Sequence, residues 1–269
     1  ASKSVTYSGV LVVDGTTESY SDQTYASTAS NQTAILVING GNLTLTGCTI
    51  TKSGDGSSSG SGTSADDSFN FYGLNSAVVA VGSGSTITLD SCTVSTAAKY
   101  ANAVFSCDGA SIAVRDGLTI TTTKDSSRGL YATYAGTITS SATGAVSITT
   151  SGAHCAALAT DRGGGTVTVT GNSTYPCTLS TAGDGSPCIY STGTISASYM
   201  TGNSTGAQAL VVEGLNSITL DDCSVSGKDA SYGGIMLYQS TSGDAATGTA
   251  SLTMTDTTIQ DNGGLAMFF

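Results

Sequence analysis

A small residue followed directly by an aliphatic residue recurs nine times along the chain, at intervals of 21 to 43 residues. Each pair opens a short apolar run, and two further apolar runs follow before the next pair. The segments 43–51 (LTLTGCTIT) and 87–95 (ITLDSCTVS) align without gaps, as do 218–226 and 252–260. A unit this short cannot bury its own apolar face, so copies of it must stack on one another. The nine aliphatic positions are Ile35, Val78, Val104, Leu130, Leu158, Ile189, Leu210, Ile235 and Leu265.

Apolar and polar residues alternate within these runs, as they do in β-strands that have one buried face. In segment 43–51, Leu43, Leu45, Cys48 and Ile50 point one way and the threonines between them point the other. Three short strands per repeat, joined by turns of variable length, predict an all-β fold in which the chain winds as a parallel β-helix. We expect about nine coils of three strands each, with the nine aliphatic positions in one buried column.

One domain is expected, made of a cap and a solenoid. Residues 1–33 precede the first repeat and are expected to cap the rod, because the end of a solenoid exposes unpaired strand edges. Residues 34–269 are expected to form the β-helix. The chain stops in mid-strand at Phe269, so we expect an incomplete last coil and a natural protein that continues beyond it.

The longest interval between repeats contains an insertion, residues 53–76. It begins with the polar stretch GDGSSSGSGTS and ends with three aromatic residues, Phe69, Phe71 and Tyr72. Two interpretations are open: a long loop between coils, or a flap whose aromatic side chains fold back on the rod.

Four glycine-rich segments follow in the second half of the chain: SSRGLYATYAGTI (126–138), GAHCAALATDRGGG (152–165), GDGSPCIYSTG (183–193) and GGIMLYQSTSGDAATG (233–248). These segments resemble the right-handed parallel β-helix domains of bacterial and archaeal surface proteins, usually called adhesin-like, within the pectate-lyase-like superfamily. The resemblance covers residues 31–269. It implies a right-handed solenoid at the cell surface, and it implies little about activity.

Charge and hydropathy exclude several classes of partner. The chain has 8 Lys and Arg against 19 Asp and Glu, so it offers no basic footprint for nucleic acid. No apolar run approaches the 18 residues of a transmembrane helix, so membrane insertion is not expected. No cofactor motif is present, and structural Ca²⁺ at the acidic turns finds no support because no D-x-D-x-D-G run occurs. The acidic pI near 4.1 and the resemblance predict a secreted or cell-surface protein.

The seven cysteines fall into two groups. Cys48, Cys92, Cys177 and Cys223 share one inward column and are expected to be small buried apolar residues. Cys107, Cys155 and Cys188 lie on or beside the first strands and are expected to be more exposed, with a Cys155–Cys188 disulfide as one open alternative. No Cys or His spacing typical of zinc occurs, so no metal site is expected.

The outward positions of the first strands, here named the first-strand face, are unusually apolar. An apolar patch of this size marks a contact surface when it is exposed. Two interpretations are open: the cap and the insertion cover this face, or Phe105, Tyr131, Tyr190 and Tyr238 form a platform for sugar rings. The outward pairs are Leu36/Ile38, Val79/Val81, Phe105/Cys107, Tyr131/Thr133, Ala159/Asp161, Tyr190/Thr192, Val211/Glu213, Met236/Tyr238 and Ala266/Phe268.

Polar groups concentrate in the middle coils of this face, which also hold the only His of the chain. Asp161 and Glu213 share a column two coils apart, roughly 9.6 Å along the rod. That separation is near the upper limit for the two carboxylates of an inverting glycosidase. The candidate catalytic residues are Asp161, Glu213, Arg162 and His154. The expected ligand-binding residues are Tyr131, Tyr134, Tyr190, Tyr238, Asp161, Arg162 and Glu213.

Three functions are compatible with this pattern. The first is a non-catalytic adhesin-like domain that binds a polysaccharide, a cell-surface glycan or another surface partner, because no complete catalytic constellation is visible. The second is a polysaccharide hydrolase or lyase that uses the first-strand face. The third is ice binding by the outward Ser and Thr residues of the third strands, here named the third-strand face.

Overall fold

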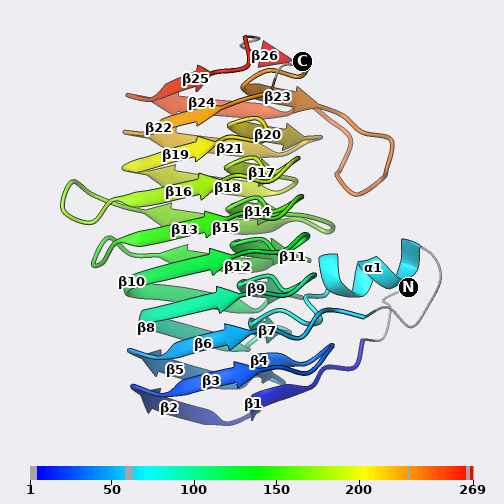
Figure 1. Ribbon diagram of the computed structural model, residues 1–269, viewed down its shortest axis with the longest axis vertical. Coiled ribbons are helices and arrows are strands. Elements are labelled where there is room, and N and C mark those ends of the chain that lie inside the picture. Colours follow the sequence, from blue (N-terminus) through cyan, green and yellow to red (C-terminus); the bar gives the residue numbers. More distant parts are fainter. Residues whose placement is uncertain (1–4, 58–62, 230, 265–266, 269) are drawn as a thin grey trace.

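The computed structural model describes residues 5–57, 63–229, 231–264 and 267–268, and within them the chain forms a parallel β-helix (Figure 1). The first strands of all coils pair in one sheet of ten strands, in the order β1-β4-β7-β9-β11-β14-β17-β20-β23-β26. The second and third strands form a sheet of 16 strands. Two long strands, β8 and β10, continue from the second position into the third and so join these two series of strands.

Nine coils are complete. The first four contain β1 (Gly9–Asp14), β2 (Thr17–Ser21) and β3 (Thr24–Ser27); β4 (Thr33–Ile38), β5 (Asn42–Thr46) and β6 (Thr49–Lys52); β7 (Val78–Val81) and β8 (Thr86–Thr96); β9 (Val104–Cys107) and β10 (Ser111–Thr122). Coils 5 and 6 contain β11 (Leu130–Thr133), β12 (Gly136–Ser140), β13 (Val146–Thr150), β14 (Leu158–Thr160), β15 (Gly165–Thr170) and β16 (Cys177–Thr181). Coils 7 to 9 contain β17 (Ile189–Ser191), β18 (Thr194–Ser198), β19 (Met200–Ser204), β20 (Leu210–Glu213), β21 (Ser217–Asp221), β22 (Ser224–Gly227), β23 (Ile235–Tyr238), β24 (Ser251–Thr255) and β25 (Thr258–Asp261), and β26 (Met267–Phe268) follows.

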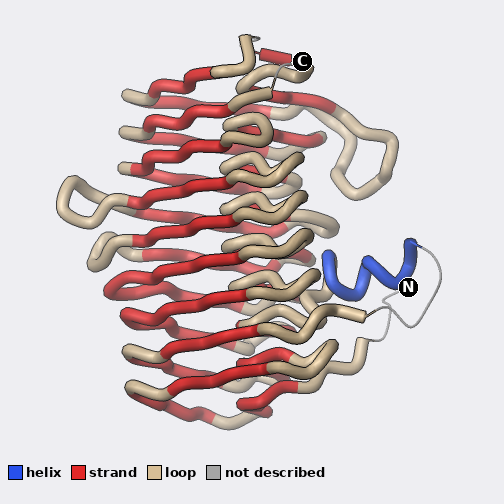
Figure 2. The backbone as a smooth tube through the Cα atoms, in the orientation of Figure 1, coloured by secondary structure: helices blue, strands red, loops and turns tan. Residues whose placement is uncertain are grey.

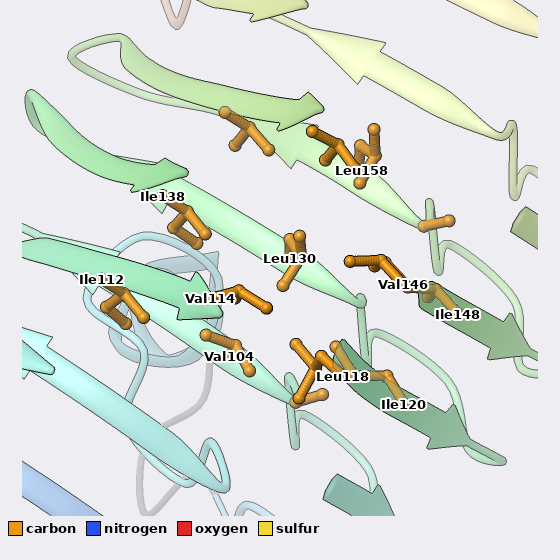
Figure 3. Packing of buried hydrophobic residues seen from close by; sticks show 14 of the residues in the cluster. Val104, Ile112, Val114, Leu118, Ile120, Leu130, Ile138, Val146, Ile148 and Leu158 are labelled. Atoms are coloured by element: carbon orange, nitrogen blue, oxygen red, sulfur yellow. The ribbon is translucent and has the colours of Figure 1, made fainter. Parts of the chain in front are cut away.

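The aliphatic column expected from the repeats lies on the axis of the rod. Ile35 pairs with Val78, and the same register continues without interruption to Ile235. All eight of these side chains are buried. Figure 3 shows how Val104, Leu130 and Leu158 of successive first strands meet the side chains of the other two strands inside the coil. The interior is therefore a stack of aliphatic layers, which supplies the apolar burial that a single repeat lacks.

The segment expected to cap the rod contributes a coil of its own. Strands β1, β2 and β3 pair in parallel with β4, β5 and β6. Leu11 takes the position below Ile35, so the buried column begins one coil earlier than the repeat pattern indicates. The repeat pattern misses this coil because its first strand does not alternate between apolar and polar residues. The outward positions Val10 and Val12 are apolar although they are exposed.

The last expected member of the column, Leu265, lies outside the described residues. In the structure Met267 pairs with Ile235, two positions further along the chain than the repeat predicts. A shift of two residues keeps the same side of the strand inward, so the alternation of faces is unchanged.

The insertion between β6 and β7 contains the single helix of the described residues, α1 (Thr63–Asn70). The helix lies beside the rod, on the side where the loop between β23 and β24 also projects (Figures 1 and 2). Its last turn and residues 71–76 lie over the first-strand face, so the insertion is a flap and not a free loop. The helix was not expected from the sequence, because its polar composition shows no apolar periodicity.

Candidate functional site

A second apolar cluster lies outside the coil, between the first-strand face and the insertion. It comprises the outward side chains Leu36, Val79, Phe105, Cys107, Tyr131, Ala156 and Ala159. Phe69 is stacked on Tyr100, with ring centroids 4.8 Å apart, and Tyr72 is stacked on Tyr134 at 5.1 Å. Thr133 donates a hydrogen bond to the carbonyl of Phe71. The insertion therefore covers the lower half of the first-strand face.

This cover corrects the expected aromatic platform. Phe105 and Tyr131 have no exposed surface, so neither ring can stack on a ligand. Tyr134 keeps part of its surface, but one face of its ring is occupied by Tyr72. Of the four rings expected to form the platform, only Tyr190 and Tyr238 remain partly exposed.

Beyond the edge of the insertion, a cleft of about 230 Å³ opens across coils 5 to 7. It is bounded by the turns that lead into β11, β14 and β17, and by the outward side chains of these strands. Its lining residues are Arg128, His154, Ala156, Asp161, Gly185, Pro187 and Tyr190.

Turns of similar geometry in three successive coils build this cleft. Arg128, Ala156 and Pro187 each directly precede the small residue that opens a repeat, so they occupy equivalent positions. Two residues earlier, His154 and Gly185 both adopt a left-handed backbone. Gly185 also leaves space for the imidazole, because a Cβ at that position would lie 2.9 Å from Nδ1 of His154.

Asp161 is the carboxylate of the cleft. One oxygen accepts a hydrogen bond of 3.0 Å from the Tyr131 hydroxyl, and the other accepts one of 2.9 Å from the backbone N–H of Arg162. Burial raises the pKa of Asp161 to about 6, although the Arg128 charge and the Tyr131 hydrogen bond act in the opposite direction. A carboxylate has about four acceptor positions, so two remain for a ligand.

Arg128 and His154 supply the guanidinium and imidazole nitrogen atoms of the cleft. The Arg128 guanidinium lies over the Tyr131 ring, 4.8 Å from its centroid, and donates to Oδ1 of Asn70 in the insertion. His154 is exposed at the mouth of the cleft. The insertion thus fixes one wall of the cleft through Asn70 and leaves the other wall open.

Glu213 does not line the cleft and is only 3% exposed. Its carboxylate accepts hydrogen bonds from the hydroxyls of Tyr190 (2.6 Å), Tyr238 (2.9 Å) and Ser240. The expectation that Glu213 contacts a ligand or acts in catalysis therefore has no geometric basis, since three hydroxyls already surround it. It orients Tyr190, whose ring forms part of the cleft.

Arg162 joins the two projections on this side of the rod. Its guanidinium forms ion pairs with Asp67 of α1 (3.2 Å) and with Asp244 of the loop between β23 and β24 (2.7 Å). It also lies 3.9 Å from the centroid of the Phe71 ring. Arg162 thus connects two segments 82 and 95 residues away from it in the sequence, and its expected contact with a ligand stays a prediction.

The expected site residues thus separate into three groups. Asp161, His154 and Tyr190 meet in one cleft, Tyr131 and Glu213 are buried supports of it, and Arg162, Tyr134 and Tyr238 lie outside its lining. Arg128 also lines the cleft, although it is not among the ligand-binding residues expected from the sequence. Arg128, Ala156 and Pro187 each directly precede the small residue that opens a repeat. This equivalence can be read from the sequence and places Arg128 beside the other two turns.

The cysteines are all free and all buried. Cys48, Cys92, Cys177 and Cys223 occupy the inward column, as expected. Cys107, Cys155 and Cys188 are completely buried, so the prediction of greater exposure was wrong. Among the described residues, no three His, Cys, Asp or Glu side chains gather where they would hold a metal ion. The same residues contain no helix of the length and hydropathy that crossing a membrane requires.

The Ser and Thr residues of the third-strand face lie in register from coil to coil. Thr49, Thr93 and Thr119 pair in sequence, and every further member of this column up to Thr258 is Ser or Thr. Hydroxyl side chains of this kind are also the ordinary outward residues of a solvated strand.

The chain matches no protein family model, no curated protein and no solved structure.

Proposed function

We propose that this protein is a glycan-binding module of the adhesin-like type, secreted or displayed at a cell surface, and that the cleft of coils 5 to 7 is its binding site. The observation that carries this proposal is the meeting of Arg128, His154, Asp161 and Tyr190 in one open cleft. Polar groups beside a partly exposed aromatic ring are what a sugar site requires. The low charge of the rod and the resemblance to β-helix surface domains support the location.

The size of the cleft favours one sugar residue. About 230 Å³ is enough for a single pyranose ring and its hydroxyls, and not for an extended oligosaccharide. The Tyr190 ring is held by the hydrogen bond to Glu213, and the Asp161 carboxylate is held by Tyr131 and the backbone. Fixed groups of this kind bind with little loss of side-chain entropy.

A polysaccharide hydrolase has less support. Hydrolysis by the usual mechanism needs two carboxylates that flank the glycosidic bond. Asp161 has a raised pKa and is the only carboxylate that lines the cleft among the residues that the structure describes, while Glu213 accepts three hydroxyl hydrogen bonds outside the lining. The second carboxylate of that mechanism is therefore absent from the cleft lining.

A glycan array followed by calorimetry on the best hits tests the proposal. Asp161→Asn and His154→Ala are expected to weaken binding at least ten-fold. The matched control is Asp184→Asn, which removes an exposed carboxylate in the adjacent turn that does not line the cleft. No binding to any glycan, or equal binding by all three variants, would contradict the site. Release of reducing or unsaturated sugars from a polysaccharide would favour the hydrolase or lyase.

A further inference from the structure

We propose that protonation of Asp161 controls the cleft, so that the protein holds a neutral sugar at neutral pH and releases it in a mildly acidic medium. This inference rests on the proposed glycan-binding function. Its basis is the position of one half-buried carboxylate, which is held by the Tyr131 hydroxyl and the Arg162 N–H and lines the cleft.

The groups around Asp161 act on its pKa in opposite directions. Burial favours the neutral acid, and the negative charge of Asp244 in the loop above acts in the same direction. The Arg128 guanidinium, the Tyr131 hydroxyl and the Arg162 N–H favour the carboxylate. These influences are opposed, and the resulting pKa of about 6 lies close to neutrality.

Tyr190, Tyr238 and Asp67 are the neighbouring titratable groups, and each is engaged in another contact. Tyr190 and Tyr238 lie on the side of coils 7 to 9, where both donate to Glu213, and burial raises the pKa of each hydroxyl. Asp67 is paired with Arg162 and is not among the residues that line the cleft. The imidazole of His154 lies at the mouth of the cleft, and the variant His154→Ala tests whether it contributes to the pH dependence.

Sugar hydroxyls bind the two forms of Asp161 differently. A hydroxyl that donates to the ionised carboxylate makes a charge-assisted hydrogen bond, roughly twice as strong as a neutral one. The protonated acid loses that advantage and offers one acceptor position fewer. If the bound carboxylate titrates at least one pH unit below the free one, affinity at pH 5 is about five- to ten-fold weaker than at pH 7.5.

Methyl glycosides of glucose, galactose, mannose and N-acetylglucosamine serve as probes, together with the best array hits. Their dissociation constants are measured from pH 5 to pH 7.5 on the whole chain. The wild type is expected to bind more weakly as the pH falls. Asp161→Asn is expected to bind weakly at every pH, and Asp184→Asn is expected to behave as the wild type. His154→Ala is expected to keep the pH dependence; if it becomes pH-independent, the imidazole is the sensor and the proposal is wrong.

A second measurement needs no ligand. The side-chain carboxyl carbon of Asp161, observed by NMR in protein labelled at aspartate and assigned from Asp161→Asn, is expected to titrate near pH 6. A midpoint near 4 would overturn the control by protonation. Glycan binding that is unchanged or tighter at pH 5 would also overturn it and leave the proposed function standing. Failure of all probes and array glycans to bind would instead remove the proposed function itself.

Discussion

Replacing Asp161 with Asn is expected to stabilise the protein at neutral pH. Folding raises the pKa of this carboxyl from 3.8 to about 6, so the folded state binds the proton more tightly than the unfolded state does. The contribution of the group to stability is therefore fully present below about pH 4 and is lost as the pH rises through 6. Each unit corresponds to about 1.4 kcal/mol, so the ionised carboxylate costs about 3 kcal/mol at pH 8.

Asparagine keeps the local hydrogen bonds without the charge. Its carbonyl oxygen can accept from the Arg162 N–H, and its amide can donate to the hydroxyl oxygen of Tyr131, which is fully buried beside it. The pKa shift already includes the attraction of Arg128, so the loss of that attraction does not need a separate correction. We expect Asp161→Asn to raise the free energy of unfolding by about 1–3 kcal/mol at pH 8 and by no more than about 0.6 kcal/mol at pH 4.

Guanidinium chloride titrations of the wild type and the variant at pH 4, 6 and 8 measure this effect. Asp184→Asn is the control for removing one negative charge from an acidic protein, and its effect is expected within about 0.5 kcal/mol at each pH. Two results would refute a pH-dependent cost of the Asp161 charge. The variant could be less stable than the wild type at pH 8, or it could be more stable by the same amount at pH 4 and at pH 8. Either result would mean that the charge of Asp161 is well compensated in the folded protein.

Two further predictions follow from the structure around this site. Arg162→Met should increase hydrogen exchange in residues 67–76 and in the loop 239–250 together, by about ten-fold, because one guanidinium forms ion pairs with both segments; faster exchange in one segment alone would show that the other is held independently. The native protein should show no rapid reaction of any thiol with Ellman's reagent and seven thiols after unfolding, because every cysteine is buried and free; a rapidly reacting thiol before unfolding would contradict the packing of the two cysteine groups.

The fold could be predicted because periodicity in a solenoid is a physical requirement and not a preference. Ile35 and the seven aliphatic residues above it had to point inward, since a strand shifted by one residue would expose its whole apolar side. The outward Ser and Thr residues followed from the same alternation. The first coil was harder to recognise, because Val10 and Val12 make its strand apolar on both sides and hide the alternation.

The sequence alone predicts the covering of the first-strand face by the insertion only as one of two alternatives. The insertion ends in aromatic residues, which need a partner, but the polar segment before them does not say where they go. The contacts that settle the question join distant parts of the chain, such as the Tyr7 hydroxyl with the Tyr72 carbonyl and Arg128 with Asn70. Contacts of this range depend on the three-dimensional path of the insertion, which no local pattern contains.

The charge of Asp161 distinguishes this cleft from the rest of the rod as a candidate functional site. The ion pair of Arg162 with Asp67 helps to hold the insertion on the first-strand face, whereas Asp161 forms no ion pair with any residue that the structure describes and its neighbouring position Ala159 is a small apolar residue. An asparagine would accept from the Arg162 N–H, donate to the Tyr131 hydroxyl oxygen and carry no charge. A carboxylate that is expected to lower stability at neutral pH and that lines a cleft, beside an arginine and the only histidine of the chain, is typical of a binding or reacting group. The third-strand face differs, because its outward residues are Ser and Thr in register. Such residues are ordinary on a solvated strand and do not by themselves indicate a binding site.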